Sequence, residues 1–438
     1  MTRRDTVALR AVWLATRTTM FVLATTPGLL GYRGDVAIYH RWYDCCFAHG
    51  AFPAADSMWQ YPPGAAVVFW LPGVLPGSYL RDFAILLLAT DLAITVMLAR
   101  HGRRPAGAFS RGVNTNPPDP PARDTSRRSF TWPERPSRPF TARRPRGSLT
   151  LVAAWYWVCG VPLIGPVALT RFDLVPVALS VAALGIAVRP AVRGGLIGAG
   201  TAIKIWPLAL LAGTPPGQWR RTVIAAAVAA GVVFATLIGG LPSFFGHQDA
   251  RGVEIESVVA APIMIWRQAG WHGNVAFHFG SQQLSGPGVG FARDISMAAM
   301  ALAVALFLAW RVLIRAGRAH WHPEFAVDAP LAATLLFLVT SSVLSPQYLL
   351  WVIGLAAVCL AAPRTTQRRV AIILLIAAGL TQVVFPIGWK QLVHGSDLIT
   401  VVLTVRDLLL VAAAALSCAR IFSASRSNAA GSSGSGCD

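Results

Sequence analysis

Asp35 follows the first long apolar stretch of the chain, at a point where the residue pattern changes. Behind it, aromatic and apolar side chains recur at three- and four-residue spacing, and these are Tyr39, Trp42, Tyr43, Cys46 and Phe47. That spacing predicts a helix over 36–47 that lies in the membrane interface with its rings at headgroup depth. Asp35 has two compatible interpretations: it caps this helix, or it is a carboxylate that takes a proton from a substrate.

Other charged side chains lie where an apolar chain has few. Lys204 falls inside the apolar segment 194–213, where an ammonium is costly and needs either an anionic partner or a path to the surface. Arg171 and Asp173 surround a phenylalanine in a turn, either as a structural ion pair or as ligands of a substrate. The remaining polar candidates are Tyr61, Arg251, Glu256, Ser257, Gln347 and Tyr348.

The composition indicates which elements must position these residues. Of the 438 residues, 55% are hydrophobic and only 13% are charged, with a mean hydropathy of +0.54. A soluble chain of this size cannot bury that much apolar surface, so an all-α polytopic membrane protein of ten to twelve transmembrane helices is expected. The expected segments are 8–30, 64–77, 83–99, 149–169, 172–188, 194–213, 222–241, 291–313, 331–344, 346–362, 370–388 and 398–420.

The net charge of +19 is concentrated in loops. Residues 100–148 hold twelve arginines and three acidic residues and are rich in proline, so we expect a disordered linker. Short loops elsewhere carry further arginines, as cytoplasmic loops do. This placement favours membrane lipids, through their anionic headgroups, and not nucleic acid as the partner of these arginines.

The cysteines do not suggest a disulfide framework. Three of the six lie in apolar segments, and Cys45 and Cys46 are neighbours, which we do not expect to pair with each other. No metal-ligand spacing is present, so neither a metal site nor another cofactor is expected. The tail 423–438 is of low complexity and is expected to be disordered.

We place the basic loops on the cytoplasmic side and thread the segments accordingly. The chain then divides into four parts: the first membrane segments with an outer loop (1–99), the linker (100–148), a membrane bundle with an outer loop at 242–290 (149–422), and the tail (423–438). Residues 194–213 are bracketed by basic residues and are expected to form a hairpin with Lys204 near its tip. Either 64–77 dips into the membrane without crossing it, or the linker lies outside; we favour the dip. Asp35, Asp173, the 251–257 stretch and SPQY (345–348) then share one face.

Six short motifs together resemble those of a known family. They are GDVAIYHRWY at 34–43, YPPG at 61–64, RFDLVP at 171–176, KIWP at 204–207, RGVEIES at 251–257 and SPQYLLW at 345–351. In this set and order the chain resembles membrane glycosyltransferases of the GT-C superfamily, most closely glycosyltransferase family 87, the actinobacterial polyprenyl-phosphate-mannose-dependent mannosyltransferases. The arginine-rich linker at 100–148 is a departure from a minimal member.

The resemblance implies a role for each candidate. Members carry an acidic residue in the first outer loop that acts as catalytic base, and Asp35 is the matching position. A polyprenyl-phosphate donor needs cationic groups at its phosphate, for which the candidates are Lys204, Arg251 and Arg171. Residues that would contact the sugar or the acceptor are Tyr39, Tyr61, Asp173, Glu256, Ser257, Gln347 and Tyr348.

The expected function is therefore an integral plasma-membrane enzyme with its active site on the extracytoplasmic face. It would move a sugar from a polyprenyl-phosphate donor to a glycolipid or glycan acceptor of the cell envelope, by inverting displacement with Asp35 as general base. The resemblance suggests mannose, and arabinose stays open. The alternative is a non-enzymatic lipid-linked-sugar flippase or transporter, which would place its costly residues near the membrane midplane.

Overall fold

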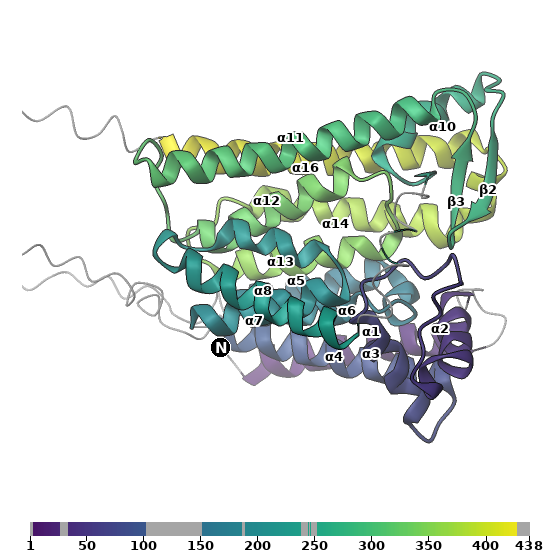
Figure 1. The fold of residues 1–438 in the computed structure, drawn as a ribbon, viewed down its shortest axis with the longest axis horizontal. Coiled ribbons are helices and arrows are strands. Elements are labelled where there is room, and N and C mark those ends of the chain that lie inside the picture. The colour runs from purple at the N-terminus through teal and green to yellow at the C-terminus, as the bar shows by residue number, and fades with distance from the viewer. Residues whose placement is uncertain are drawn as a thin grey trace, which may run out of the picture.

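The long helices run side by side, and short helices and a small sheet gather at one end of the molecule (Figure 1). The computed structural model describes residues 3–26, 34–101, 151–185, 189–237, 244, 246 and 252–426. We call the end that holds α2 (Gly34–Cys45) and the strands the sheet end. The opposite end, where α1 begins, is called the arginine end.

Within the described ranges, six helical segments are long and apolar enough to cross a membrane. They contain α1 (Arg3–Thr25), α4 (Tyr79–His101), α8 (Trp219–Thr236), α11 (Val289–Arg315), α14 (Arg368–Gln382) and α16 (Asp397–Arg426). Shorter apolar helices stand between them, namely α3 (Ala65–Trp70), α5 (Val152–Gly160), α6 (Leu174–Gly185), α12 (Phe325–Thr340) and α13 (Leu349–Ala361). The chain is thus a mostly helical, multi-pass membrane protein, as its composition predicts.

Because of the direction in which the helices run, the arginines at their termini gather at one end of the bundle. Helices α8 and α14 start at the arginine end with paired arginines, and α4, α11 and α16 finish there. Their terminal arginines are Arg100, Arg220, Arg221, Arg315, Arg368, Arg369 and Arg426. Helix α4 ends at His101 and α5 begins at Val152, both at this end, and linker 102–148 lies outside the described residues. Helix α16 also extends to Arg426, which corrects the expectation of disorder at 423–426.

The segment 64–77 does not cross the bundle. Helix α3 and the following 3-10 turn (Leu71–Val74) together contain too few residues for the hydrocarbon core, about 15 Å of helix against roughly 30 Å. The hydroxyl of Tyr79, at the start of α4, donates to the carbonyl of Phe69 at 2.6 Å, so the chain turns back on itself. This geometry agrees with the favoured threading, a dip followed by one crossing in α4, and the sides of the membrane stay a prediction.

The predicted hairpin at 194–213 is also present. Helix α7 (Pro190–Ile203) is followed by a 3-10 helix (Trp206–Gly213), and Lys204 lies at the turn between them. Helix α7 packs tightly on α8 because Gly194 and Gly198 allow backbone contact. A Cβ at either glycine would lie 2.2 Å from a backbone oxygen of α8, so neither position tolerates a side chain.

The outer loop carries regular structure that the sequence reading did not predict. Strands β1 (Val253–Glu254), β2 (Asn274–His278) and β3 (Ser281–Ser285) form an antiparallel sheet in the order β1-β3-β2. Glu254 pairs with Gln283 in this register. The fold is therefore not all-α, and the sheet, together with α10 (Ala261–Gln268), covers the end of the bundle.

Two buried arginines in the bundle have acidic neighbours. Arg17 pairs with Asp91 at 3.0 Å, and Trp157 donates its indole N–H to the same carboxylate. Arg406 lies 3.0 Å from the carboxylate of the adjacent residue, Asp407. The Nη2 atom of Arg406 also donates to the carbonyl of Glu256 at 2.8 Å.

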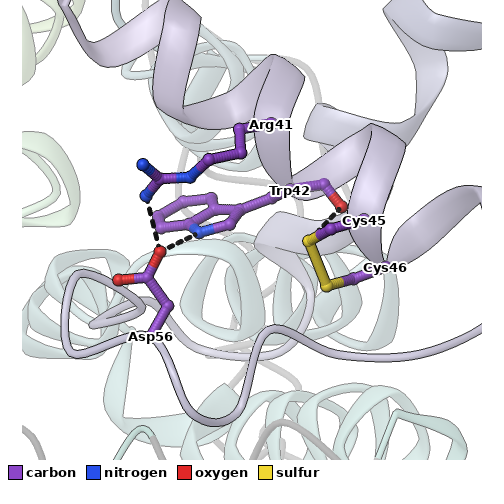
Figure 2. Close-up of a disulfide and its surroundings, with 5 residues drawn as sticks. All are labelled: Arg41, Trp42, Cys45, Cys46 and Asp56. Atoms are coloured by element: carbon purple, nitrogen blue, oxygen red, sulfur yellow. Dashed lines mark hydrogen bonds and ion pairs between the residues drawn. A yellow bond between two sulfur atoms is a disulfide. The ribbon is translucent and has the colours of Figure 1, made fainter.

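Cys45 and Cys46 form a disulfide with each other, which contradicts the expectation from their adjacency. Helix α2 ends at Cys45, and Cys46 has a φ of −139°, so the backbone leaves helical geometry between the two sulfurs. Figure 2 shows the bond beside Trp42, whose indole N–H donates to Asp56 at 2.8 Å. Arg41 donates to the same carboxylate at 2.7 Å, which fastens α2 to the following loop.

Candidate functional site

A polar pocket of about 50 Å³ opens at the sheet end. Its wall comes from segments that are far apart in sequence: α2, the 58–61 loop, the turn before α6, the tip of the α7 hairpin, β1, the β2–β3 turn and the SPQY segment. Its charged residues are Asp35, Arg171, Lys204 and Glu254. The predicted gathering of distant polar motifs at one end is therefore seen in the pocket itself.

Asp35 lies in the first turn of α2, which starts at Gly34, so it is not the cap residue itself. Its carboxylate forms an ion pair with the guanidinium of Arg171, and the two side chains are 14% and 20% exposed. Burial lowers the pKa of Arg171, while Asp173, Tyr348 and Glu254 raise it. An arginine nevertheless stays protonated at neutral pH, so the pair is ionic.

The aromatic face of α2 is buried in the protein and not in the lipid interface, which corrects the sequence interpretation. Tyr39 and Trp42 are each 1% exposed. Tyr39 stacks on Phe69 of the α3 dip with ring centroids 4.1 Å apart, and Tyr61 meets it edge-on. The short α3 segment supplies the apolar surface that this stripe needs. The packing fixes the rotation of α2 and so directs Asp35 into the pocket.

Lys204 has an anionic partner. Its Nζ lies 2.6 Å from Oδ1 of Asp173, which is 1% exposed, and the ammonium also stands 4.6 Å from the ring centroid of Tyr348. Trp351 donates its indole N–H to the same Asp173 oxygen at 2.6 Å. Snorkelling is therefore excluded for Lys204. Asp173 does not line the pocket but orients the lysine that does.

Glu254 is the site residue that sequence reasoning missed. It lines the pocket, is 3% exposed and accepts a hydrogen bond from the Ser345 hydroxyl at 3.4 Å. The RGVEIES stretch holds two glutamates that are two residues apart, and alternation alone would place both on the same face of a strand. Strand β1 ends at Glu254, so the end of the strand, which the sequence does not signal, separates the two side chains.

The other predicted residues divide between the pocket and its surroundings. Tyr39, Tyr61, Gln347 and Tyr348 line the pocket. Glu256 and Ser257 are buried outside its lining. Burial raises the pKa of Glu256 to about 8. Arg251 lies outside the described residues. Roles of these residues toward a substrate stay predictions.

Gln347 has an unsatisfied acceptor. It is 4% exposed, and its Oε1 has no hydrogen-bond partner among the residues that the structure describes. A buried amide oxygen is costly without a donor. Its place in the pocket wall means that a ligand hydroxyl would satisfy it. In the described part of the chain, no three His, Cys, Asp or Glu side chains are grouped to hold a metal ion.

The family model of glycosyltransferase family 87 matches residues 59–346, well over half of the chain. The chain belongs to glycosyltransferase family 87. The matched region of this membrane glycosyltransferase includes Arg171, Lys204 and Glu254 and begins after Asp35. A search among curated proteins finds no match.

Among solved structures, this family 87 protein is similar to two crystal structures of ArnT from Cupriavidus metallidurans. The form bound to undecaprenyl phosphate aligns with a TM-score of 0.43 and 13% identity, over 96% of this chain and 79% of that chain. The apo form aligns with a TM-score of 0.46 and 12% identity, over 95% and 77%. Similarity at this level carries no argument about the site.

Proposed function

We propose that this protein transfers a sugar from a polyprenyl-phosphate donor to a glycolipid or glycan acceptor of the cell envelope. Membership of glycosyltransferase family 87 supports the reaction class. The observation that carries the proposal is that a candidate base and two cations open on one pocket: Asp35, Arg171 and Lys204. An acceptor hydroxyl and a phosphate leaving group need these two kinds of side chain.

The proposed step is a single displacement. Asp35 removes the proton from the acceptor hydroxyl while that oxygen forms a bond to the anomeric carbon. The bond between the anomeric carbon and the phosphate oxygen breaks, and its electron pair leaves with polyprenyl phosphate. The anomeric centre is inverted, so a β-linked donor gives an α-linked product.

The cations stabilise the leaving phosphate. Lys204 is held in place by Asp173, so it is arranged before the substrate arrives. Arg171 presents a planar pair of donors and forms an ion pair with Asp35. A donor phosphate would draw Arg171 away from Asp35 and leave the carboxylate available to the acceptor. Arg251 is proposed as a third phosphate ligand on the basis of the sequence motif alone.

The active site is proposed to face the extracytoplasmic side. Paired arginines mark the opposite end of the bundle, and such residues prefer the cytoplasm. Linker 102–148, with most of the arginines of that region, is attached at the same arginine end. Anionic lipid headgroups would surround these side chains.

The sugar is proposed to be mannose, with arabinose as the alternative, and Tyr39, Tyr61, Gln347 and Tyr348 as its surroundings. A flippase or transporter is less well supported. Arg17 and Asp91, a charged pair between two of the long helices, are buried and form an ion pair with each other. The carboxylate of Asp91 also accepts hydrogen bonds from the indole N–H groups of Trp13 and Trp157. The polar groups that can meet a substrate lie at one end.

The test is sugar transfer by the purified protein in lipid nanodiscs. Radiolabelled polyprenyl-phosphate-mannose and polyprenyl-phosphate-arabinose are each supplied with cell-envelope lipid acceptors, and the product linkage is determined. We expect an α-linked product from one donor, together with release of polyprenyl phosphate. Transfer only from a nucleotide-sugar, or movement of intact donor across the bilayer without transfer, would contradict the proposal.

A further inference from the structure

The pocket holds two cations, Arg171 and Lys204, and two carboxylates, Asp35 and Glu254. The phosphate of a donor is anionic and would be attracted to Arg171 and Lys204 but repelled by a carboxylate. A sugar ring is uncharged and carries several hydroxyl donors. A hydrogen bond from such a hydroxyl to an ionised carboxylate is stronger than one between neutral groups.

The carboxylate of Glu254 is held on a rigid support. Its backbone N–H donates to the carbonyl of Ser342 at 3.0 Å, and its carbonyl accepts the Ser257 hydroxyl at 2.8 Å. Strand pairing with Gln283 fixes the register. The Ser345 hydroxyl donates to Oε2 of Glu254. A residue locked from several sides in this way can discriminate between substrate geometries.

A second polar group follows the serine that donates to this carboxylate. Gln347 is two residues after Ser345, lines the same pocket and presents the amide oxygen that no described residue satisfies. Two buried acceptors, one a carboxylate and one an amide oxygen, thus border a cavity that also has the rings of Tyr61 and Tyr348 in its wall. Two hydrogen-bond acceptors beside aromatic rings suit a ligand that carries several hydroxyl groups.

We propose that Glu254 binds a hydroxyl of the transferred sugar ring and thereby determines which sugar the enzyme accepts. The inference rests on the proposed function and deepens it. It orients the donor, with phosphate at Arg171 and Lys204 and the sugar ring toward Glu254 and Gln347. A site that hydrogen-bonds a substrate hydroxyl rejects an analogue that lacks it, because its own polar groups are then left unpaired.

The experiment compares two lipids that differ only in the sugar. Binding of undecaprenyl phosphate and of polyprenyl-phosphate-mannose to the full chain in nanodiscs is measured for the wild type and for Glu254→Gln. We expect Glu254→Gln to weaken the sugar-bearing lipid by about ten- to a hundred-fold and to leave the sugar-free lipid within about two-fold. Glu324→Gln, at the arginine end, is the matched control and should change neither.

Monodeoxy-mannose donors identify the hydroxyl. The wild type should discriminate against one of them, and Glu254→Gln should lose most of that discrimination. Ser345→Ala, which removes one hydrogen bond to the carboxylate, should give a smaller effect in the same direction if Glu254→Gln fails to fold. Equal weakening of both lipids, no weakening, or a change only toward the acceptor would overturn the inference.

Failure of this inference differs from failure of the proposed function. If the wild type transfers sugar but Glu254→Gln binds both lipids normally, only the role of Glu254 is lost. If the wild type neither binds these lipids nor transfers sugar from them, both are overturned.

Discussion

The Nζ atom of Lys204, which lines the pocket, and the Oδ1 atom of Asp173, which does not, lie 2.6 Å apart. Asp173 precedes α6, while Lys204 ends α7, so the pair joins the turn before α6 to the tip of the hairpin. Trp351 of α13 donates to the same carboxylate. One buried carboxylate therefore holds three parts of the bundle and positions a pocket cation.

Lys204→Met should lower both stability and donor use. The substitution leaves Asp173 buried without its cation, a change that typically costs about 3–5 kcal/mol. Adding Asp173→Asn should restore most of the thermal stability in detergent but not the affinity for polyprenyl-phosphate donors. Lys390→Met, at an exposed lysine, serves as control. If the double variant regains normal donor affinity, Lys204 acts only through folding.

The two ends of the bundle should lie on opposite sides of the membrane. In a background whose native cysteines are replaced, Ser285→Cys and Asp397→Cys at the sheet end should react with a membrane-impermeant thiol reagent in intact cells. Arg318→Cys at the arginine end should react only after the membrane is opened. All three positions are exposed. Labelling of Arg318→Cys in intact cells, with Ser285→Cys protected, would reverse the proposed orientation.

Stability should fall as the pH rises through the range in which Glu256 titrates. Burial raises its pKa to about 8, with Glu254 and Asp407 adding to the shift and Arg406 opposing it. The unfolded chain releases this proton near its ordinary pKa of 4.5. Between these two values the folded state alone holds the proton, so increasing pH favours unfolding, and the effect levels off above the higher value.

Glu256→Gln provides the check, because it keeps the shape of the neutral acid and removes the titration. Thermal midpoints in detergent, measured from about pH 5 to about pH 9, should decline less for Glu256→Gln than for the wild type. Parallel declines would show that another group is responsible.

The sequence predicted the parts of the fold that depend on hydropathy and charge. The long helices, the dip at 64–77 and the hairpin around Lys204 follow from apolar length and from the positions of arginines. The sheet did not follow, because β1 has only two residues and its partner β3 lies far along the chain. Glu254 was missed because so short a strand leaves no pattern that separates it from Glu256.

Two other details depend on tertiary structure. The aromatic stripe of α2 has the pattern of an interfacial helix, but α3 dips beneath it and buries Tyr39 and Trp42. The disulfide between Cys45 and Cys46 requires the local end of a helix, which residue adjacency alone does not reveal. Asp35 lines the pocket, and its role as the base stays a prediction from its motif.

The most direct test of the central claim is the rate of sugar transfer by Asp35→Asn, measured with a polyprenyl-phosphate donor in nanodiscs. The amide keeps the size of the side chain but cannot take a proton. We expect a loss of about 100- to 10,000-fold in rate, with normal insertion and with donor binding retained. The matched control Asp44→Asn, on the exposed side of α2, should retain activity. An Asp35→Asn enzyme that transfers sugar at the wild-type rate would contradict the assignment of Asp35 as the base.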